Sequence, residues 1–142
     1  MNKIQIEFYD SAYAKVLNTG IVGKLQKKVH KLVDAPLKKS HYGNVLELGS
    51  GDLVHLYQFR KKYDFYEVTD LRFEEERINE LRKKIINKYP NDHEKISFSK
   101  LDAQNGQIIE ESQDLIIATC LLIHLNSPQI ALTKWKKAMR KN

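Results

Sequence analysis

The pattern of apolar and polar positions changes once along the chain. Residues 10–34 carry apolar side chains at helical spacing in two blocks, which the sequence NTG at residues 18–20 separates. From residue 44 onward, short apolar runs alternate with segments of helical spacing. The pattern therefore predicts a helical N-terminal extension over residues 1–40 and an α/β domain over residues 41–142.

Four apolar runs predict the strands of this domain, at residues 44–48, 65–70, 96–101 and 114–120. Continuous apolar strands that alternate with helices are typical of a parallel sheet, because helices then cover both of its faces. We expect a Rossmann-like, mainly parallel sheet with helices on both faces. The fourth run is mainly apolar, so we expect its strand to be covered on both faces.

Helical spacing follows the first two strands, over residues 53–59 and 73–89. Ser127 and Pro128 predict the start of a last helix, as N-cap and first-turn proline. That helix is expected to turn one apolar face inward: Ile130 or Ala131, Trp135 and Met139. The spacing also places Ile86 on the buried face of the second helix, and Pro36 ends the last helix of the extension before it.

Length and composition limit the class of protein. The chain has 142 residues, which suffices for one domain with its own core. A single cysteine, Cys120, excludes an internal disulfide and favours a reducing compartment. The N-terminus has no apolar segment of signal-peptide length, and the longest apolar run is about half of the ~20 residues that a membrane span needs. We therefore expect a cytoplasmic protein without a membrane span.

The formal net charge is +6, and the basic residues are clustered. The two clusters are Lys24, Lys27, Lys28, Lys31, Lys38 and Lys39, and Lys134, Lys136, Lys137, Arg140 and Lys141. Such clusters attract anionic partners, or they form a solvated helix face. No aromatic residues alternate with the lysines, and lysine is less suited than arginine to reading base edges. We therefore expect nucleic acid not to be a partner beyond weak, salt-sensitive binding.

Two glycines, Gly49 and Gly51, separate the first strand from the helix that follows it. Asp70 comes 19 residues after Gly51, at the end of the second strand, where a carboxylate can bind the ribose hydroxyls of an adenosine. A dinucleotide is excluded, because Val54 occupies the place of the third glycine or alanine of its fingerprint. Glu47 would also repel a pyrophosphate, whereas it would attract a ligand with a cationic amino group.

Four blocks in order, VLELGSGD, VTD, KLDAQ and DLIIATCLLIHL, resemble class I S-adenosylmethionine-dependent methyltransferases over residues 44–142. The resemblance implies a set of cofactor-binding residues: Glu47, Gly49, Ser50, Gly51, Asp70, Leu71, Asp102, Ala103, Thr119 and Cys120. By this resemblance, residues 47–51 lie under the methionine part of S-adenosylmethionine and Asp70 binds the ribose. Leu71, Asp102 and Ala103 would lie at the adenine, and Thr119 and Cys120 near the methionine part and the acceptor.

The chain departs from the family in two places. Leu53 stands where the family commonly has a third glycine. A fifth strand, which in the family pairs with the fourth, is expected to be missing together with the rest of the C-terminal third. An apolar strand edge without charges is a template for pairing, so we expect the chain to form homo-oligomers through its fourth strand or to aggregate.

The catalytic group is the least determined part of the site. His124 is the candidate general base, because its unperturbed pKa lies near neutrality. Tyr9 and Tyr13 share a helix face in the extension and can close over the cofactor or the substrate, or simply pack the extension onto the domain. Cys120 is expected to be a small buried residue rather than a nucleophile. No cysteine or histidine pair indicates a metal site.

The sequence leaves three functions open. The first is methyl transfer to a small-molecule acceptor with S-adenosylhomocysteine as product. It is favoured because the sequence TCLLIHL stands where enzymes that methylate base amines carry a block of the NPPY type. The second is a non-catalytic, cofactor-binding or structural fragment of such an enzyme. The third is an RNA methyltransferase that uses the lysine clusters.

Overall fold

The computed structural model describes residues 20–37, 40–51, 54–58 and 62–141. The first predicted helix, with Tyr9 and Tyr13, lies outside these described residues. The chain divides into two compact units, residues 1–39 and 40–142, and each is considered by itself.

In the first unit, the described residues form one helix, α3 (Gly20–Leu37). It begins at Gly20, the last residue of the predicted break. It continues through Pro36 to Leu37, so the prediction that it ends before the proline is wrong. A proline within a helix removes the hydrogen bond to the carbonyl four residues earlier, and its ring crowds that carbonyl. Because α3 ends one residue after Pro36, these costs fall on the last turn of the helix.

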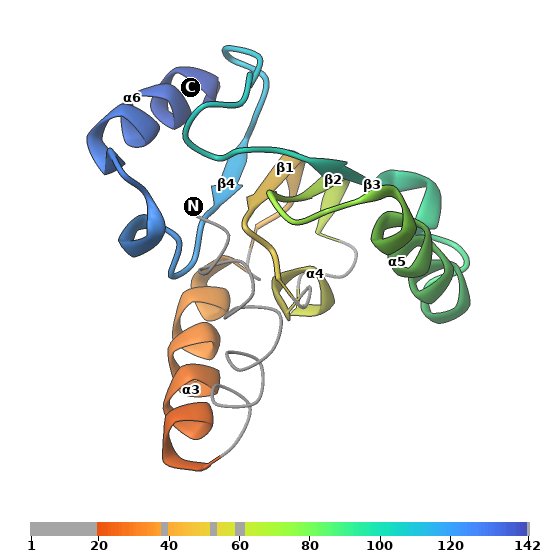
Figure 1. The fold of residues 1–142 in the computed structure, drawn as a ribbon. Helices are drawn as coiled ribbons and strands as arrows, with labels where there is room; N and C mark the ends of the chain where they lie inside the picture. The colour runs from red at the N-terminus through yellow and green to blue at the C-terminus, as the bar shows by residue number, and fades with distance from the viewer. Residues whose placement is uncertain (1–19, 38–39, 52–53, 59–61, 142) are drawn as a thin grey trace. The chain divides into compact units, whose positions relative to one another are not determined.

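The second unit contains a four-stranded, fully parallel sheet (Figure 1). Its strands are β1 (Tyr42–Leu48), β2 (Tyr63–Asp70), β3 (Ile96–Lys100) and β4 (Leu115–Ile117), in the order β3-β2-β1-β4. The predicted Rossmann-like fold is confirmed. In a parallel sheet all strands end at the same edge, so the segments that follow the four strands meet there.

Three α-helices accompany the sheet: α4 (Val54–Gln58), α5 (Glu75–Lys88) and α6 (Pro128–Ala138). Two short 3₁₀ helices, η2 (His93–Lys95) and η3 (Leu122–His124), precede β3 and α6. Ser127 is the N-cap of α6 and Pro128 its first residue, as predicted. The Ser127 amide donates a hydrogen bond to Gln104 Oε1 (2.8 Å), which ties the start of α6 to the segment after β3.

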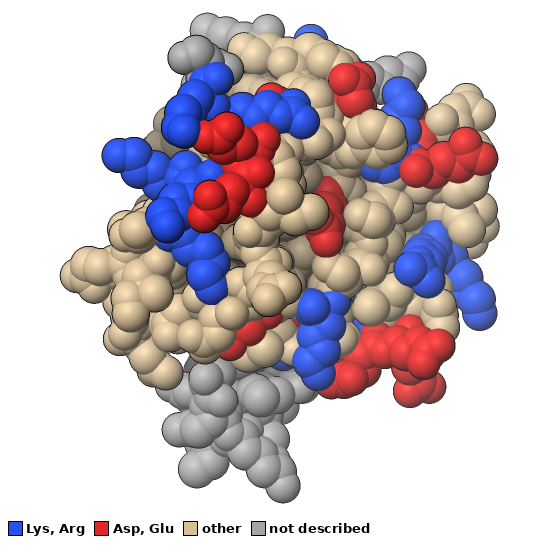
Figure 2. All heavy atoms as spheres, turned by 90° about the horizontal axis from the view of Figure 1, so that it is seen from above, with Lys and Arg blue, Asp and Glu red and all other residues tan. Residues whose placement is uncertain are grey.

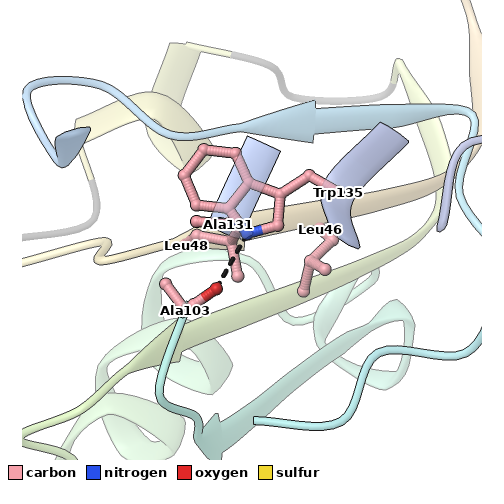
Figure 3. Packing of buried hydrophobic residues seen from close by; sticks show 5 residues of the cluster. All are labelled: Leu46, Leu48, Ala103, Ala131 and Trp135. Carbon is pink, nitrogen blue, oxygen red and sulfur yellow. Dashed lines mark hydrogen bonds between the residues drawn. The ribbon is translucent and has the colours of Figure 1, made fainter. Parts of the chain in front are cut away.

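Alternate residues of β1 point to opposite faces of the sheet, and one face packs on α6. Leu46 and Leu48 form a buried cluster with Ala103, Ala131 and Trp135 (Figure 3). The Trp135 indole Nε1 donates a hydrogen bond to the Ala103 carbonyl (2.8 Å) within this cluster. This core fixes the segment after β3 and helix α6 to the same face of the sheet.

The exposed fractions of the side chains test two predictions of which helix residues face the core. Ala131 and not Ile130 faces the core, since Ile130 is 60% exposed. On α5, Leu81 and Ile85 are buried, but Ile86 is 46% exposed, so its predicted burial is wrong. Each residue advances about 100° around a helix, so Ile86 lies outside the stripe that Leu81 and Ile85 share.

The chain folds back along the side of β4 that faces away from β1. Asp114 donates its amide to the Asn44 carbonyl of β1, whereas Gln113 forms a parallel bridge with Met139 on the other side. The Arg140 amide also donates to the Gln113 carbonyl (2.9 Å). Strand β4 has three residues, so its open edge is shorter than the edge expected over residues 114–120. Among the described residues, no strand pairs with this side of Leu115–Ile117.

Asp114 connects both sides of this edge. Its Oδ2 accepts the Asn44 amide (2.6 Å) and the Arg140 guanidinium (2.8 Å). These hydrogen bonds hold the pKa of Asp114 below its usual value, so the carboxylate stays charged near neutrality. A Cβ at Gly43 would lie 2.5 Å from Oδ2, which explains the glycine at this point of β1.

Candidate functional site

The segment after β1 carries the two glycines in a conformation that favours glycine. Gly49 has φ 65° and Gly51 has φ 53°, both in the left-handed region. Between them, the Ser50 amide donates to the Thr69 carbonyl of β2 (3.0 Å). The Ser50 hydroxyl is buried and finds no hydrogen-bond partner among the described residues. The glycine loop, residues 49–51, is therefore fixed to the end of β2.

Asp70, at the end of β2, contacts the glycine loop directly. Its Oδ2 accepts the Gly51 amide (3.2 Å), so the carboxylate lies against the loop. Arg72 binds the same carboxylate through its amide and its guanidinium. Leu71, between them, is half-buried. Sequence reasoning missed Arg72, for which the only signal was a cation two residues after Asp70.

Glu47 is buried within β1, with 1% of its surface exposed. Its Oε2 accepts the hydroxyl of Tyr66 on the neighbouring strand (2.6 Å), and its carbonyl accepts the Thr69 hydroxyl (2.8 Å). Tyr66 thus supplies this buried carboxylate with a hydrogen-bond donor. Strand alternation places Glu47 on the face opposite Leu46 and Leu48.

Asp102 and Ala103 follow β3 beside the end of β2, where the Leu101 amide lies 3.4 Å from the Asp70 carbonyl. The Asp102 carboxylate accepts both Asn105 nitrogens and the Gln104 amide, and so closes the turn over residues 103–105. Burial would raise its pKa, but these hydrogen bonds outweigh burial and hold the pKa below its usual value. Asp102 thus has a structural task besides any contact with a ligand.

The segment after β4 reaches back to the glycine loop. Cys120 has φ 58°, a strained value for a residue other than glycine. It is exposed, so the expectation of a small buried residue is wrong. Leu121 covers Gly49, because a Cβ on Gly49 would lie 2.9 Å from Leu121 Cδ1. Thr119 is half-buried beside Cys120. The ends of β1, β2 and β4 therefore converge on residues 49–51.

His124 lies in η3, three residues after Leu121, and its amide donates to the Leu121 carbonyl (2.9 Å). Partial burial lowers the pKa of its imidazole, because desolvation disfavours the charged form. The imidazole is accordingly neutral at neutral pH, which is the form that can accept a proton.

The structure also has a groove that none of the predicted site residues lines. This groove of about 680 Å³ is lined by residues 105–110 and by the outer side of α6, including Ile109 and Ile130. Along the described part of the chain, no cluster of three or more potential ligands could hold a metal ion. Nor is any described helix long and apolar enough to span a membrane.

The C-terminal basic cluster has acidic partners in space. Ion pairs join Lys137 to Glu110 (3.7 Å), and Lys141 to Glu111. Arg140 pairs with Asp114, as described above. Figure 2 shows Lys and Arg side chains interspersed with Asp and Glu on the face that it presents.

Solved structures resemble the chain in fold. A phosphoethanolamine N-methyltransferase of Haemonchus contortus, in complex with phosphoethanolamine and S-adenosylhomocysteine, has a TM-score of 0.74 at 17% identity, over 98% of this chain and 29% of that one. A SAM-dependent methyltransferase of Aquifex aeolicus has a TM-score of 0.57 at 20% identity, over 75% and 57%. The YcgJ protein of Bacillus subtilis has a TM-score of 0.62 at 15% identity, over 76% and 46%.

The chain thus spans less than two thirds of the length of each of these structures. No curated protein sequence matches it significantly. Residues 46–142, which include the end of β1, the other three strands, the glycine loop, Asp70 and α6, match the family model described as a methyltransferase domain. The chain belongs to the methyltransferase domain family.

Proposed function

We propose that the chain binds S-adenosylmethionine at the glycine loop and takes part in methyl transfer. The observation that carries the proposal is the hydrogen bond from the Gly51 amide to Asp70. It places a carboxylate beside a glycine turn, whose backbone a ligand can approach closely because glycine has no side chain. A carboxylate accepts hydrogen bonds only, so it suits the two hydroxyls of a ribose. In this proposal Asp70 binds the ribose, and Leu71, Asp102 and Ala103 lie along the adenine.

The methionine part of the cofactor is assigned to residues 47–51, with Thr119 and Cys120 at the methyl group. The Ser50 hydroxyl, which has no hydrogen-bond partner within the described part of the chain, is one polar group that could bind it. Glu47 carries the charge that suits an ammonium group, and its hydrogen bond with Tyr66 holds the carboxylate in place. S-adenosylmethionine supplies the methyl group as an electrophile. The chain's own residues would align the acceptor with it, and alignment supplies much of the rate.

The proposed acceptor is a small molecule. His124 is the candidate base for an amine or hydroxyl acceptor, supported by its lowered pKa. Residues 1–40, with Tyr9 and Tyr13, are proposed as a lid over the site. The single cysteine supports a cytoplasmic location. The alternative is a cofactor-binding or structural role without catalysis, which the fold accommodates equally well.

Calorimetric titration of the chain with S-adenosylmethionine and S-adenosylhomocysteine tests this proposal. Asp70→Ala is expected to weaken binding by on the order of 1.5–3 kcal/mol, or about ten- to a hundredfold, the range for a hydrogen bond to a charged group. Asp64→Ala is the matched control, because Asp64 lies on the same strand in an exposed pair with His41. Equal affinity of the Asp70 variant and the wild type would remove Asp70 from the site.

We do not propose nucleic acid as a partner, and we therefore disfavour the third function, an RNA methyltransferase. The ion pairs that Glu110, Glu111 and Asp114 make with the C-terminal bases support this view, since they reduce the local positive charge. Phosphate-driven affinity falls steeply with salt. Tight binding of RNA that persists at raised salt would contradict the proposal.

We also propose that two copies associate through the open side of β4. Hydrogen-bonding groups of a strand alternate sides, so those of Leu115 point, like those of Gln113, away from β1. Leu115→Pro removes the amide on that side without breaking a bond to β1, and we expect it to reduce association. Sedimentation at increasing concentration measures the effect. A wild-type chain that stays monomeric at high concentration would show that this edge does not associate.

A further inference from the structure

The carboxylate of Asp70 has no free acceptor position. A carboxylate offers about four lone-pair sites, two on each oxygen. Oδ1 accepts the Arg72 amide (2.9 Å) and Arg72 Nε (3.0 Å). Oδ2 accepts the Gly51 amide (3.2 Å) and Arg72 Nη2 (3.2 Å). Two of these four donors belong to the backbone and two to a single guanidinium.

The guanidinium also covers the glycine loop. Arg72 Nη2 lies 4.0 Å from the position that a Cβ on Gly51 would take. The ion pair is largely shielded from water, since the side chain of Asp70 is 7% exposed and that of Arg72 is 28% exposed. A ligand that approaches the loop to reach Asp70 therefore meets Arg72 first.

We propose that Arg72 is an internal competitor for the ribose position of the cofactor site. This inference rests on the proposed function, because it takes Asp70 as the ribose acceptor. Backbone amides cannot leave the carboxylate without unfolding the turn, whereas a guanidinium can rotate away. Cofactor binding then requires Nε and Nη2 to release Asp70. The apparent affinity equals the intrinsic affinity multiplied by the fraction of molecules in which Arg72 has released the carboxylate.

Arg72→Gln is the direct test, with S-adenosylhomocysteine as the probe. This ligand carries no net charge, so loss of a cation should affect its binding through competition at Asp70 rather than through long-range attraction. We expect binding to tighten about three- to tenfold in calorimetry, the gain expected if Arg72 occupies Asp70 in about two thirds to nine tenths of the unliganded molecules. Arg72→Lys should give a smaller gain in the same direction, because lysine keeps the charge but cannot bind both oxygens in a fork.

Two controls isolate the competition. Arg77→Gln removes an arginine from an exposed pair with Glu80 on α5 and should leave the affinity unchanged. In an Asp70→Ala background, Arg72→Gln should bring no gain, because no carboxylate remains to be occupied. Thermal unfolding of each variant without ligand checks that it is folded before its affinity is compared.

The outcomes separate this inference from the function on which it rests. If the wild type and the Arg72 variants all fail to bind both S-adenosylhomocysteine and S-adenosylmethionine, the proposed function is wrong and the inference falls with it. If the wild type binds and Arg72→Gln binds equally or more weakly, only the competition is wrong. If Arg72→Gln tightens binding of S-adenosylmethionine alone, the gain comes from the loss of repulsion between Arg72 and the sulfonium. That result would also overturn the competition.

Discussion

Replacing Trp135 by alanine is expected to destabilise the unit of residues 40–142 by about 3–5 kcal/mol, the range for truncating a buried aromatic side chain. The indole lies in the cluster that joins α6 to β1 (Figure 3), and it also donates a hydrogen bond to Ala103. Its loss leaves a cavity against Leu46 and Leu48 and an unpaired carbonyl. Urea unfolding followed by circular dichroism measures the change in the free energy of unfolding.

Trp135→Phe keeps most of the apolar volume and removes the indole nitrogen, so it should cost clearly less than alanine. Lys136→Ala, at the next and exposed position of α6, should change stability by less than about 0.5 kcal/mol. A loss below about 1 kcal/mol for Trp135→Ala would contradict the burial of this side chain. Should the alanine variant fail to fold, the phenylalanine variant still measures the contribution of the site.

The parallel sheet and its alternation with helices could be predicted because they depend on local patterns. Apolar runs of strand length and the helical stretches between them leave few arrangements other than a parallel sheet. Positions at the margins of these patterns could not be predicted. Ile86 is apolar but lies just beside the buried stripe of α5, and Pro36 is tolerated because α3 ends one residue later. The length of β4 depends on the residues that pair with it, which the run itself does not reveal.

In the candidate site, too, some contacts could be predicted from the sequence and others could not. The meeting of Gly51 with Asp70 follows from chain topology, because parallel strands end at one edge of the sheet. The partners of Glu47 and Asp70 do not follow from it. Tyr66 reaches Glu47 only through the register of β1 against β2, and Arg72 reaches Asp70 only through the turn after β2. The acids that pair with the C-terminal bases are likewise remote in sequence.

Gly49→Ala is expected to destabilise the glycine loop by about 2–3 kcal/mol and to weaken binding of S-adenosylmethionine. The residue has φ 65°, a conformation that costs an L-residue roughly 1–2 kcal/mol. The added methyl would also lie 2.9 Å from Leu121 Cδ1, closer than such contacts normally are. Urea unfolding reports the first effect and calorimetry the second.

Gly51→Ala separates the two causes, because Gly51 has a similar φ of 53°, whereas the described residue nearest to its added methyl is Arg72, with Nη2 at 4.0 Å. It should therefore show the backbone strain without the overlap, and its loss of stability should be smaller. In the double variant Gly49→Ala with Leu121→Ala, the overlap is removed and the strain remains. The effect of Gly49→Ala should then fall to that of Gly51→Ala. An unchanged effect in the Leu121→Ala background would mean that the segment after β4 does not rest on the loop, and the convergence of β1 and β4 on residues 49–51 would be wrong.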